Sequence, residues 1–544
     1  AEFLDTLQGL AWGLPLIFLL LAAGMLFTFR LGFLQLRSFV HAIAVITGRY
    51  DDPEKEGDIT HFQALCAALS ATVGVGNIAG VATALHHGGP GAIFWMWVAG
   101  FFGMATKFAT CTLSQKFRKV NPDGSISGGP MYYIQIGLGP RFKWLALLFA
   151  LTTVVASFGG GNMVQSSEMT RAATEQVATW MGDGYQESFL FRVLYVPPGG
   201  EESEEPAAPG AGEEQVGAAD GLPDGAITPL RICLGLLVST LVGLVIIGGI
   251  RRIGRVAAKL VPSMAILYCT GALFILLANF DRLIPALDLI VREAFHPTAA
   301  AAGTAGAGFL AVLTWGIKRA VFSNEAGLGS APIAHAAAKT DEPVREGLVA
   351  MVGPFIDTLV ICTMTALVIL VATDLPETKL EGARGGARVS IDEAVANPSE
   401  RESASANPEN QGGGSGPLYR RLDGSVLTKK AFERGIPWGN GAYGALVVAL
   451  GLVLFAISTA ISWSYYGDRC VEYLVGPRAI MPYRWCFVSF LFMGAVVKIQ
   501  SVWDFADFTM ATMAFWNLIG VIGLSGVIIA LTRDYMGRDH QPYR

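Results

Sequence analysis

The stretch that decides the fold is a glycine-broken hydrophobic segment, Ala71-Thr72-Val73-Gly74-Val75-Gly76-Asn77-Ile78-Ala79-Gly80. It lies within a run of about twenty-five mostly apolar residues, which is long enough for a membrane-spanning helix. Unwound backbone at membrane depth persists only where it lines a cavity or a ligand site, because no water satisfies its peptide groups. Gly74 and Gly76 are expected to relax the backbone, and the amide oxygen of Asn77 can face a cation. The segment predicts a midplane site of the kind secondary transporters use; a kinked helix packed on small residues is the alternative.

The composition is that of an integral membrane protein. Of 544 residues, 52% are hydrophobic and only 15% are charged, and the mean hydropathy is +0.47; soluble proteins carry about a quarter charged residues. The seven cysteines follow no metal-ligand spacing and indicate no disulfide framework. The chain begins at Ala1 without an initiator Met or a basic leader, so we expect processing there, and residues 10–29 are expected to be a helix rather than a signal peptide.

Eleven membrane-spanning helices are predicted, which makes this an all-α polytopic membrane protein. They lie near residues 10–29, 62–86, 91–113, 143–165, 229–250, 260–279, 301–322, 347–372, 442–466, 483–500 and 509–532. The seventh has the weakest pattern, because its start is small and glycine-rich. The chain is thereby divided into 1–185 (segments one to four), an acidic insertion at 186–228, 229–373 (segments five to eight), a second insertion at 374–440, and 441–544 (segments nine to eleven and a tail).

Basic residues gather in alternate loops. The loops after the first, third and fifth segments and the C-terminal tail carry Lys and Arg, whereas 86–90 and 500–508 hold none. The positive-inside rule then places the N-terminus outside and the C-terminus in the cytoplasm of a multi-pass protein of the plasma (inner) membrane. Both polar insertions fall outside, and their composition predicts disordered or loosely structured loops. A small ligand-capturing domain is the alternative.

Six motifs resemble those of the alanine/glycine:cation symporter family, and together they cover nearly the whole chain outside the two insertions. They are Gly-Val-Gly-Asn-Ile-Ala-Gly (74–80), Gly-Pro-Gly-Ala-Ile-Phe-Trp-Met-Trp (89–97), Gly-Gly-Pro-Met-Tyr-Tyr-Ile (128–134), Gly-Asn-Met-Val-Gln (161–165), Phe-Ser-Asn-Glu-Ala-Gly-Leu-Gly-Ser-Ala-Pro (322–332) and Trp-Ser-Tyr-Tyr-Gly (463–467). The resemblance implies sodium-driven uptake of small neutral amino acids on a LeuT-like fold. It also implies a 5+5 inverted repeat, segments two to six and seven to eleven, with broken first helices. A second break is accordingly predicted at 303–309, Gly-Thr-Ala-Gly-Ala-Gly-Phe.

An amino-acid zwitterion needs donors for its carboxylate and acceptors for its ammonium. Free N–H groups at the start of a half-helix can hold the carboxylate, and unwound carbonyls with Gln165 can hold the ammonium. In a LeuT-like register Trp463 would shorten the cavity and favour alanine and glycine over leucine; an interfacial belt aromatic is the alternative. The expected substrate-binding residues are Thr72, Val75, Gly76, Asn77, Gln165, Gly306 and Trp463.

Sodium is a hard cation, and hydroxyls with backbone carbonyls can hold it without a full charge. In the LeuT-like arrangement Ser458 and Thr459 face the carbonyl of Val73 and make one sodium site, while Thr72 and Asn77 contribute to a second. Hydroxyls in membrane helices often only bond back to the previous turn, which is the alternative. Asp357 lies about ten residues into its helix, and a carboxylate at that depth is a functional-site candidate. We favour for it a buried ion pair with Lys107, Lys318 or Arg319.

Other classes of membrane protein fit less well. A channel would need a repeated pore-lining ring, and an enzyme would need a motif such as HExxH, GxSxG or a nucleotide loop; the sequence has neither. We therefore expect a symporter rather than an enzyme, with sodium as coupling ion, a small neutral amino acid and membrane lipid as partners, and no organic cofactor or nucleic acid. Proton-coupled or exchange-mode amino-acid transport is the alternative.

Overall fold

The structure, a computed structural model, describes residues 9, 11–181, 229–295, 305–373, 418–439, 441–496 and 502–540. Helices make up most of these ranges, and the strands among them are β1 (Lys119–Val120) and β2 (Ile126–Ser127), which pair in a short antiparallel hairpin. The prediction of a mostly helical protein is confirmed.

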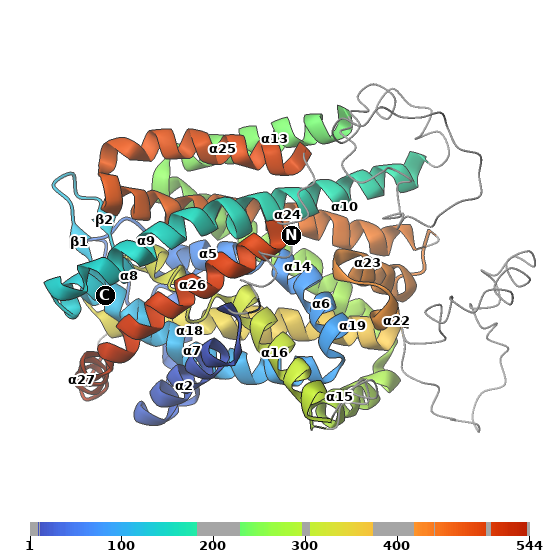
Figure 1. The fold of residues 1–544 in the computed structure, drawn as a ribbon, viewed down its shortest axis with the longest axis horizontal. Helices are drawn as coiled ribbons and strands as arrows, with labels where there is room; N and C mark the ends of the chain where they lie inside the picture. Colours follow the sequence, from blue (N-terminus) through green and yellow to red (C-terminus); the bar gives the residue numbers. More distant parts are fainter. Residues whose placement is uncertain are drawn as a thin grey trace, which may run out of the picture.

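The helices up to residue 295 include the first six predicted segments and four helices that were not predicted, α3, α4, α8 and α15 (Figure 1). In chain order they are α2 (Leu14–Arg30), α3 (Leu34–Arg37), α4 (Phe39–Ile46), α5 (His61–Thr72), the π-helical η1 (Gly76–Gly80), α6 (Val81–Gly88), α7 (Gly91–Lys116), α8 (Pro130–Gly137), the 3-10 turn η2 (Pro140–Phe142), α9 (Lys143–Phe158), the π-helical η3 (Gly159–Met163), α10 (Val164–Met181), α13 (Pro229–Ile246), α14 (Gly249–Ala278) and α15 (Phe280–Phe295).

The remaining helices include several short ones that the hydrophobic pattern did not predict. They are α16 (Ala305–Asn324), α17 (Ala331–His335), α18 (Pro343–Pro354), the π-helical η5 (Phe355–Cys362), α19 (Thr363–Thr373), α22 (Leu418–Arg421), α23 (Gly424–Gly435), α24 (Ala442–Val475), the 3-10 turn η6 (Pro477–Ala479), α25 (Ile480–Val496), α26 (Val502–Gly523) and α27 (Ser525–Met536).

Membrane crossing is supported by length and composition. Within the described ranges, 8 helices are long and apolar enough to span a bilayer, or 9 if the bent pair α5 and η1–α6 counts as one span. The predicted first segment is the 17-residue α2, which is shorter. The predicted seventh is α16, whose apolar character is interrupted by Lys318 and Arg319. The protein is thus a multi-pass helical membrane protein.

The basic loops meet at one end of the molecule. Arg118 donates to the carbonyls of Glu56, Ala338 and Thr340, and Arg251 pairs with Asp58 at 3.0 Å. Figure 1 places the β1–β2 hairpin and the C-terminus at this end, opposite α22 and α23. The grouping of basic loops on which the predicted orientation depends is therefore present in the structure.

The end of the second polar insertion is folded, contrary to the prediction of a loosely structured loop over 374–440. Residues 418–421 and 424–435 form α22 and α23, and α23 buries Leu427, Ala431 and Phe432 against the bundle. Its apolar positions recur at helical spacing, a signal that the polar composition of the surrounding sequence obscured. The insertion at 186–228 and residues 374–417 lie outside the described residues.

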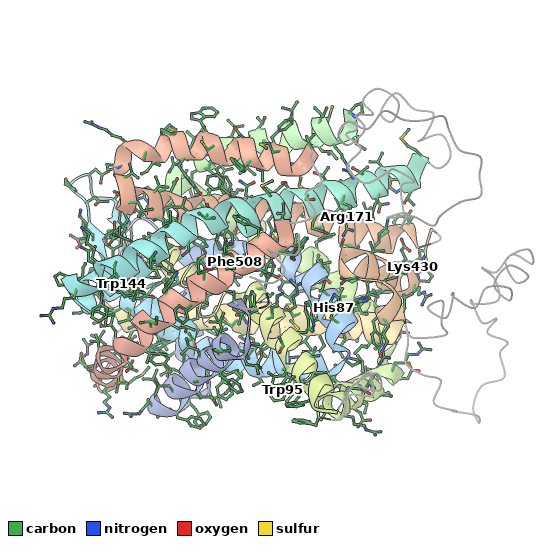
Figure 2. The ribbon with its side chains drawn as sticks, viewed as in Figure 1. His87, Trp95, Trp144, Arg171, Lys430 and Phe508 are labelled. Atoms are coloured by element: carbon green, nitrogen blue, oxygen red, sulfur yellow. The ribbon has the colours of Figure 1, made fainter. Side chains whose placement is uncertain are left out.

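The broken helix lies in the interior of the bundle, and helices at the edge expose apolar side chains on its surface. All residues from Ala64 to Val81 are buried, whereas α13 and α25, which pack side by side along one edge, expose large apolar residues such as Leu237 and Trp485. Trp144 projects from α9 toward the end opposite Lys430 of α23 (Figure 2). Exposed apolar side chains suit a lipid-facing surface.

Candidate functional site

The first helix break follows Thr72, as predicted. Val73 leaves the helix with an extended backbone, and the axes of α5 and of η1–α6 differ by 55°. Asn77 bridges the gap: its side-chain Oδ1 accepts the Gly74 N–H at 2.8 Å, and its backbone N–H donates to the Gly74 carbonyl at 3.1 Å. The amide oxygen that we expected to face a cation is therefore engaged by the break itself.

Gly74 and Gly76 leave space for neighbouring helices, and neither position requires a left-handed backbone conformation. Neither has a positive φ. A Cβ on Gly74 would lie 2.6 Å from Thr459 Oγ1, and one on Gly76 would lie 3.3 Å from Phe322 and from the backbone of Ser323. The small size of the glycines thus lets two other helices approach the break closely.

The second break is not where it was predicted. Residues 305–309 are regular helix in α16, and residues 303–304 lie outside the described residues. The break comes instead at residues 325–330, where Glu325 has φ 56° and Gly327 and Gly329 have φ 93° and 88°. Left-handed backbone ends a helix, whereas glycines in regular conformation continue it. Gly306 lies 18 positions before Asn324, roughly 27 Å along α16, so the structure does not bring it to the breaks.

A buried lysine ends the helix at the second break. Lys107 of α7, 1% exposed, donates from Nζ to the carbonyl of Asn324, the last residue of α16, at 3.0 Å. A cation suits the negative end of a helix dipole, where the last carbonyls lack partners. Beyond it, Ser330 Oγ donates to Glu325 at 2.6 Å and closes the loop.

Asp357 joins the two breaks, and the ion pair predicted for it is wrong. Its carboxylate accepts from Asn77 Nδ2 at 2.6 Å and from Ser323 Oγ and Thr358 Oγ1 at 2.9 Å. We call Asn77, Ser323, Asp357 and Thr358 the Asp357 cluster; every member is completely buried.

The basic residues considered as partners of Asp357 bind elsewhere. Lys318 pairs with Asp507 at 2.7 Å, and Arg319 approaches the same carboxylate at 3.9 Å. Lys107 is bonded to Asn324. Among the described residues no basic side chain lies within ion-pair distance of Asp357, and a buried carboxylate held by three neutral donors is a functional candidate by default.

Ser458 and Thr459 lie against α5, the first half of the broken helix, and against Gly74. Ser458 Oγ donates to the Ser70 carbonyl at 3.2 Å, and Ser70 Oγ donates to the Ser458 carbonyl at 2.7 Å. Thr459 Oγ1 is buried, has no hydrogen-bond partner among the described residues, and faces Gly74. A buried hydroxyl oxygen without a partner can accept a hydrogen bond or coordinate a cation.

Gln165 also reaches the first break. Its Nε2 donates to Gly160 at 2.9 Å across η3, while its buried Oε1 has no partner among the described residues and lies 3.6 Å from the Cβ position of Gly74. Thr72, by contrast, donates weakly to the Leu69 carbonyl of its own helix, at 3.4 Å. Thr72 thus bonds back to the previous turn of its own helix, which is the alternative to a role in ion binding.

Trp463 is a core residue rather than an interfacial one. It is 1% exposed and packs its indole on Gly161 of η3, where a Cβ would lie 2.3–2.5 Å from the ring and Cβ of Trp463. Tyr466 meets it edge to face at 5.5 Å. The alternative of a belt aromatic is excluded.

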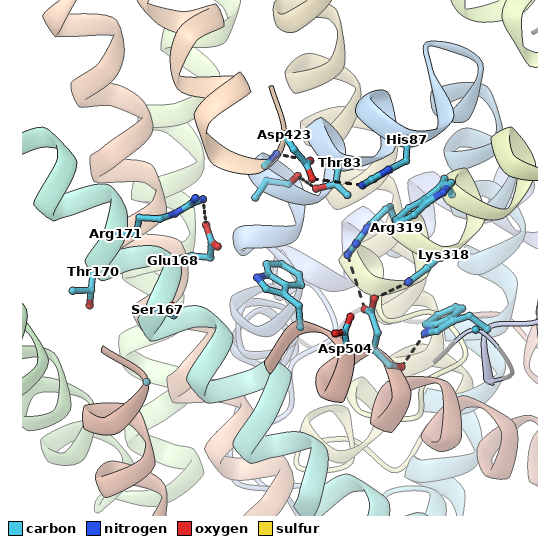
Figure 3. Close-up of a pocket in the computed structure, with 18 of the residues that line it drawn as sticks. Thr83, His87, Ser167, Glu168, Thr170, Arg171, Lys318, Arg319, Asp423 and Asp504 are labelled. Carbon is cyan, nitrogen blue, oxygen red and sulfur yellow. Dashed lines mark hydrogen bonds and ion pairs between the residues drawn. The ribbon is translucent and has the colours of Figure 1, made fainter. Parts of the chain in front are cut away.

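A charged cavity of about 700 Å³ lies beside α6, the second half of the broken helix, between α6, α10, α16, α23 and α26 (Figure 3). Arg171 with Glu168, and Lys318 with Asp507, form ion pairs in its lining. The guanidinium of Arg319 lies over the rings of Phe322 and Trp503 at 5.7 and 5.5 Å.

An aromatic pair lies where this cavity approaches the first break. Phe322 and Trp503 stack at 5.4 Å. Trp503 lines the cavity, whereas Phe322 contacts the position of Gly76. Ala79 of η1 lines the cavity as well, so the cavity borders the first break beside this aromatic pair.

Sequence reasoning missed the second break and with it Ser323, Asn324 and Glu325. The segment was noted only as a motif, because it follows an apolar helix without a drop in hydrophobicity. Its pair of glycines two residues apart, Gly327 and Gly329, was the available signal, since such spacing after a helix end favours left-handed turns.

Comparison with known proteins identifies the family of the chain. The sodium:alanine symporter family model matches residues 1–196, 210–397 and 414–543. The chain is 38% identical over 536 residues to the sodium/alanine symporter AgcS of Methanococcus maripaludis, covering 98% of this chain and 97% of that protein. It is 32% identical over 541 residues to the probable sodium/glutamine symporter GlnT of Bacillus subtilis, covering 98% and 91%.

The fold is shared with a solved transporter. MhsT, crystallised with L-phenylalanine, superposes with a TM-score of 0.50 at 14% identity, over 88% of this chain and 89% of that one. The fold is therefore LeuT-like, with breaks in two interior helices. The family model and the relative AgcS, which match nearly the whole chain, identify a transporter rather than an enzyme, and the chain belongs to the sodium:alanine symporter family.

Proposed function

We propose that this protein is a secondary active symporter that couples inward sodium movement to the uptake of small neutral amino acids, alanine and glycine, by alternating access. The observation that carries the proposal is the meeting of two helix breaks at one buried carboxylate. Asn77 from the first break and Ser323, two residues before the second, both donate to Asp357. Two interrupted helices that converge in this way present unpaired backbone groups of both signs at one point.

The substrate carboxylate is assigned to the start of η1. The Asn77 amide is already bonded to Gly74, which leaves the amides of Val75 and Gly76 as the donors we assign. The free Oε1 of Gln165 and the carbonyls of the breaks are assigned to the ammonium group. Both halves of a zwitterion are then bound by fixed dipoles without a countercharge.

Trp463 is the proposed reason for a small substrate. A buried indole packed on Gly161 occupies space that a longer side chain would need. Family membership alone does not choose the substrate, since one relative is described as a glutamine symporter. The proposal of alanine and glycine as substrates therefore depends on the space that the Trp463 indole occupies.

Sodium is assigned to oxygen atoms on either side of the first break. Thr459 Oγ1, with Ser458 and the Val73 carbonyl, forms one site; the free buried hydroxyl at Thr459 fits an oxygen ligand. Asn77 and Thr72 were expected to form a second. We add Asp357 to it, because an unneutralised carboxylate supplies the charge that amide and hydroxyl oxygens lack.

In the membrane we propose eleven spans: α2 and α16 are added to the 9 that length and composition support among the described residues when the bent pair counts as one span. Segments two to six and seven to eleven form the two inverted repeats. The N-terminus lies outside and the C-terminus in the cytoplasm of the plasma (inner) membrane, because the basic loops gather at the end where the C-terminus lies.

Proton coupling is the second candidate, and one observation favours it. Glu325 and Asp357 are buried carboxylates, 3% and 0% exposed, at the two breaks. Such groups can carry a proton through a closed state of a transporter.

Labelled alanine uptake into proteoliposomes tests the proposal. An inward sodium gradient at constant pH should drive accumulation, and a proton gradient in sodium-free buffer should not. Asp357→Asn should lose sodium dependence, whereas Asp288→Asn, an exposed carboxylate of α15 paired with Arg292, should retain it. Accumulation driven equally by protons without sodium would favour the second candidate.

A further inference from the structure

A group of potential metal ligands lies outside the proposed transport site, at the rim of the charged cavity. One ligand atom each from His86, His87 and Asp423 lies within 4.8 Å of the other two. His86 and His87 end α6, the second half of the broken helix, and Asp423 precedes α23. Figure 3 shows Asp423, Thr83 and His87 together, apart from the Lys318 ion pair. The group therefore links a half-helix of the site to the helical cap formed by α22 and α23.

Each member of the group is held in place by other contacts. His86 Nδ1 lies 3.1 Å from the carbonyls of both Tyr419 and Leu422, so the ring donates from this nitrogen and a neutral imidazole keeps its lone pair on Nε2. His87 stacks on Trp315 at 4.3 Å. Histidines that bind metals characteristically donate their other ring nitrogen to a carbonyl or a carboxylate, which fixes the tautomer.

Asp423 supplies the negative charge. One carboxylate oxygen accepts the Gly424 N–H at 2.5 Å, and the other lies 3.6 Å from His87 Nε2. The side chains of His87 and Asp423 are 40% and 44% exposed, so an ion can reach them from solvent.

We propose that His86, His87 and Asp423 form a binding site for a divalent transition metal, zinc being the best match, that clamps α6 to the α22–α23 cap. Two imidazoles and a carboxylate form a three-ligand zinc set with one position left for water. The ligands of a tetrahedral zinc are roughly 3.3 Å apart, by the bond lengths of such sites, so only a small closure of the observed group is needed. Nitrogen ligands disfavour magnesium and calcium.

The consequence for transport rests on the proposed function. α6 carries η1, and α23 already contacts η1 through Thr428 Oγ1, which donates to the Ile78 carbonyl at 3.0 Å. Metal bound between them would hold α6 in one position. Zinc added outside should therefore inhibit alternating access, and a chelator should restore it.

Equilibrium binding tests the site without any transport. Purified full-length protein, stripped of metal, is titrated with zinc in competition with a chromogenic chelator. We expect one saturable zinc per chain, at least tenfold weaker binding in His87→Gln and in Asp423→Asn, and no change in His41→Gln, whose histidine lies on α4. The same titration with magnesium should show no binding. Absence of saturable zinc in the native protein, or native affinity in both site variants, would overturn the proposal.

Uptake measurements then test the clamp. Zinc should reduce sodium-driven alanine uptake by the native protein and should have at least tenfold less potency on His87→Gln, with size-exclusion profiles confirming that both are folded. Zinc that binds at this site but leaves native uptake unchanged would overturn the clamp. Zinc binding in a protein that transports no amino acid would instead contradict the proposed function and leave the metal site intact.

Discussion

At the scale of single residues, the free hydroxyl of Thr459 makes the sharpest prediction about sodium. Replacing both Ser458 and Thr459 with Ala removes two oxygens beside the first break. The sodium concentration for half-maximal uptake should rise about tenfold or more, because an interaction with a charged group contributes roughly 1.5–3 kcal/mol. Ser464→Ala is the control, since Ser464 Oγ bonds only back to Ile461 of its own helix. An unchanged sodium dependence in the double variant would remove these hydroxyls from the ion site.

Trp463 makes a prediction about selectivity. Trp463→Leu should admit valine or leucine, because the smaller side chain leaves more space beside Gly161. It should weaken glycine binding, because the smallest substrate loses its contact with the indole. Competition of unlabelled amino acids against labelled alanine measures the rank order. Trp97→Leu, on α7 with its indole bonded to Thr363, removes similar volume elsewhere and should preserve that order. A native rank order in Trp463→Leu would place the indole outside the substrate pocket.

At the scale of elements, the second break depends on left-handed glycines. Gly329 has φ 88°, and a Cβ there would lie 2.8–2.9 Å from Pro130, Phe149 and Asn517. Gly329→Ala should lower the free energy of unfolding by roughly 1–3 kcal/mol through backbone strain alone, with steric overlap adding to it. Thermal unfolding in detergent should show a clear loss, whereas Gly526→Ala, with open space around its Cβ position on α27, should not lower stability. Equal melting temperatures would show that the loop can relax.

At the scale of the whole molecule, the two polar insertions should differ in importance. Replacing 190–226 with a short Gly/Ser connector should preserve sodium-coupled uptake, because α10 and α13 on either side pack against α25. A variant that inserts and folds but no longer binds alanine would mean that the acidic segment captures the substrate.

A matched pair of deletions in the second insertion extends this test. Removing 380–412 leaves α22 and α23 intact and should retain uptake. A deletion that continues through residue 435 removes the Thr428 bond to Ile78 and the packing of Phe432, and it should abolish uptake. Retained uptake in the longer deletion would show that the helical cap is dispensable.

Several features were predictable from sequence because local rules govern them. Apolar runs predict helices of spanning length wherever lipid is the solvent, and most observed spans follow the predicted segments. The first break was predictable because glycines interrupt an apolar run there. The cap helix α23 was missed because its apolar positions are few, and the second break because Glu325 adopts a left-handed turn directly after an uninterrupted helix.

The sequence by itself determined the class of protein, the position of the first break, and the family through its motifs. Only the tertiary structure decided which polar groups share one site. Asn77, Ser323 and Asp357 are separated by up to 280 positions, so no local pattern relates them, and Asp357 was assigned a basic partner that it does not have. In a bilayer each buried polar group must find its partner inside the protein. Those partners come from whichever helices pack together, and packing is a property of the assembled bundle.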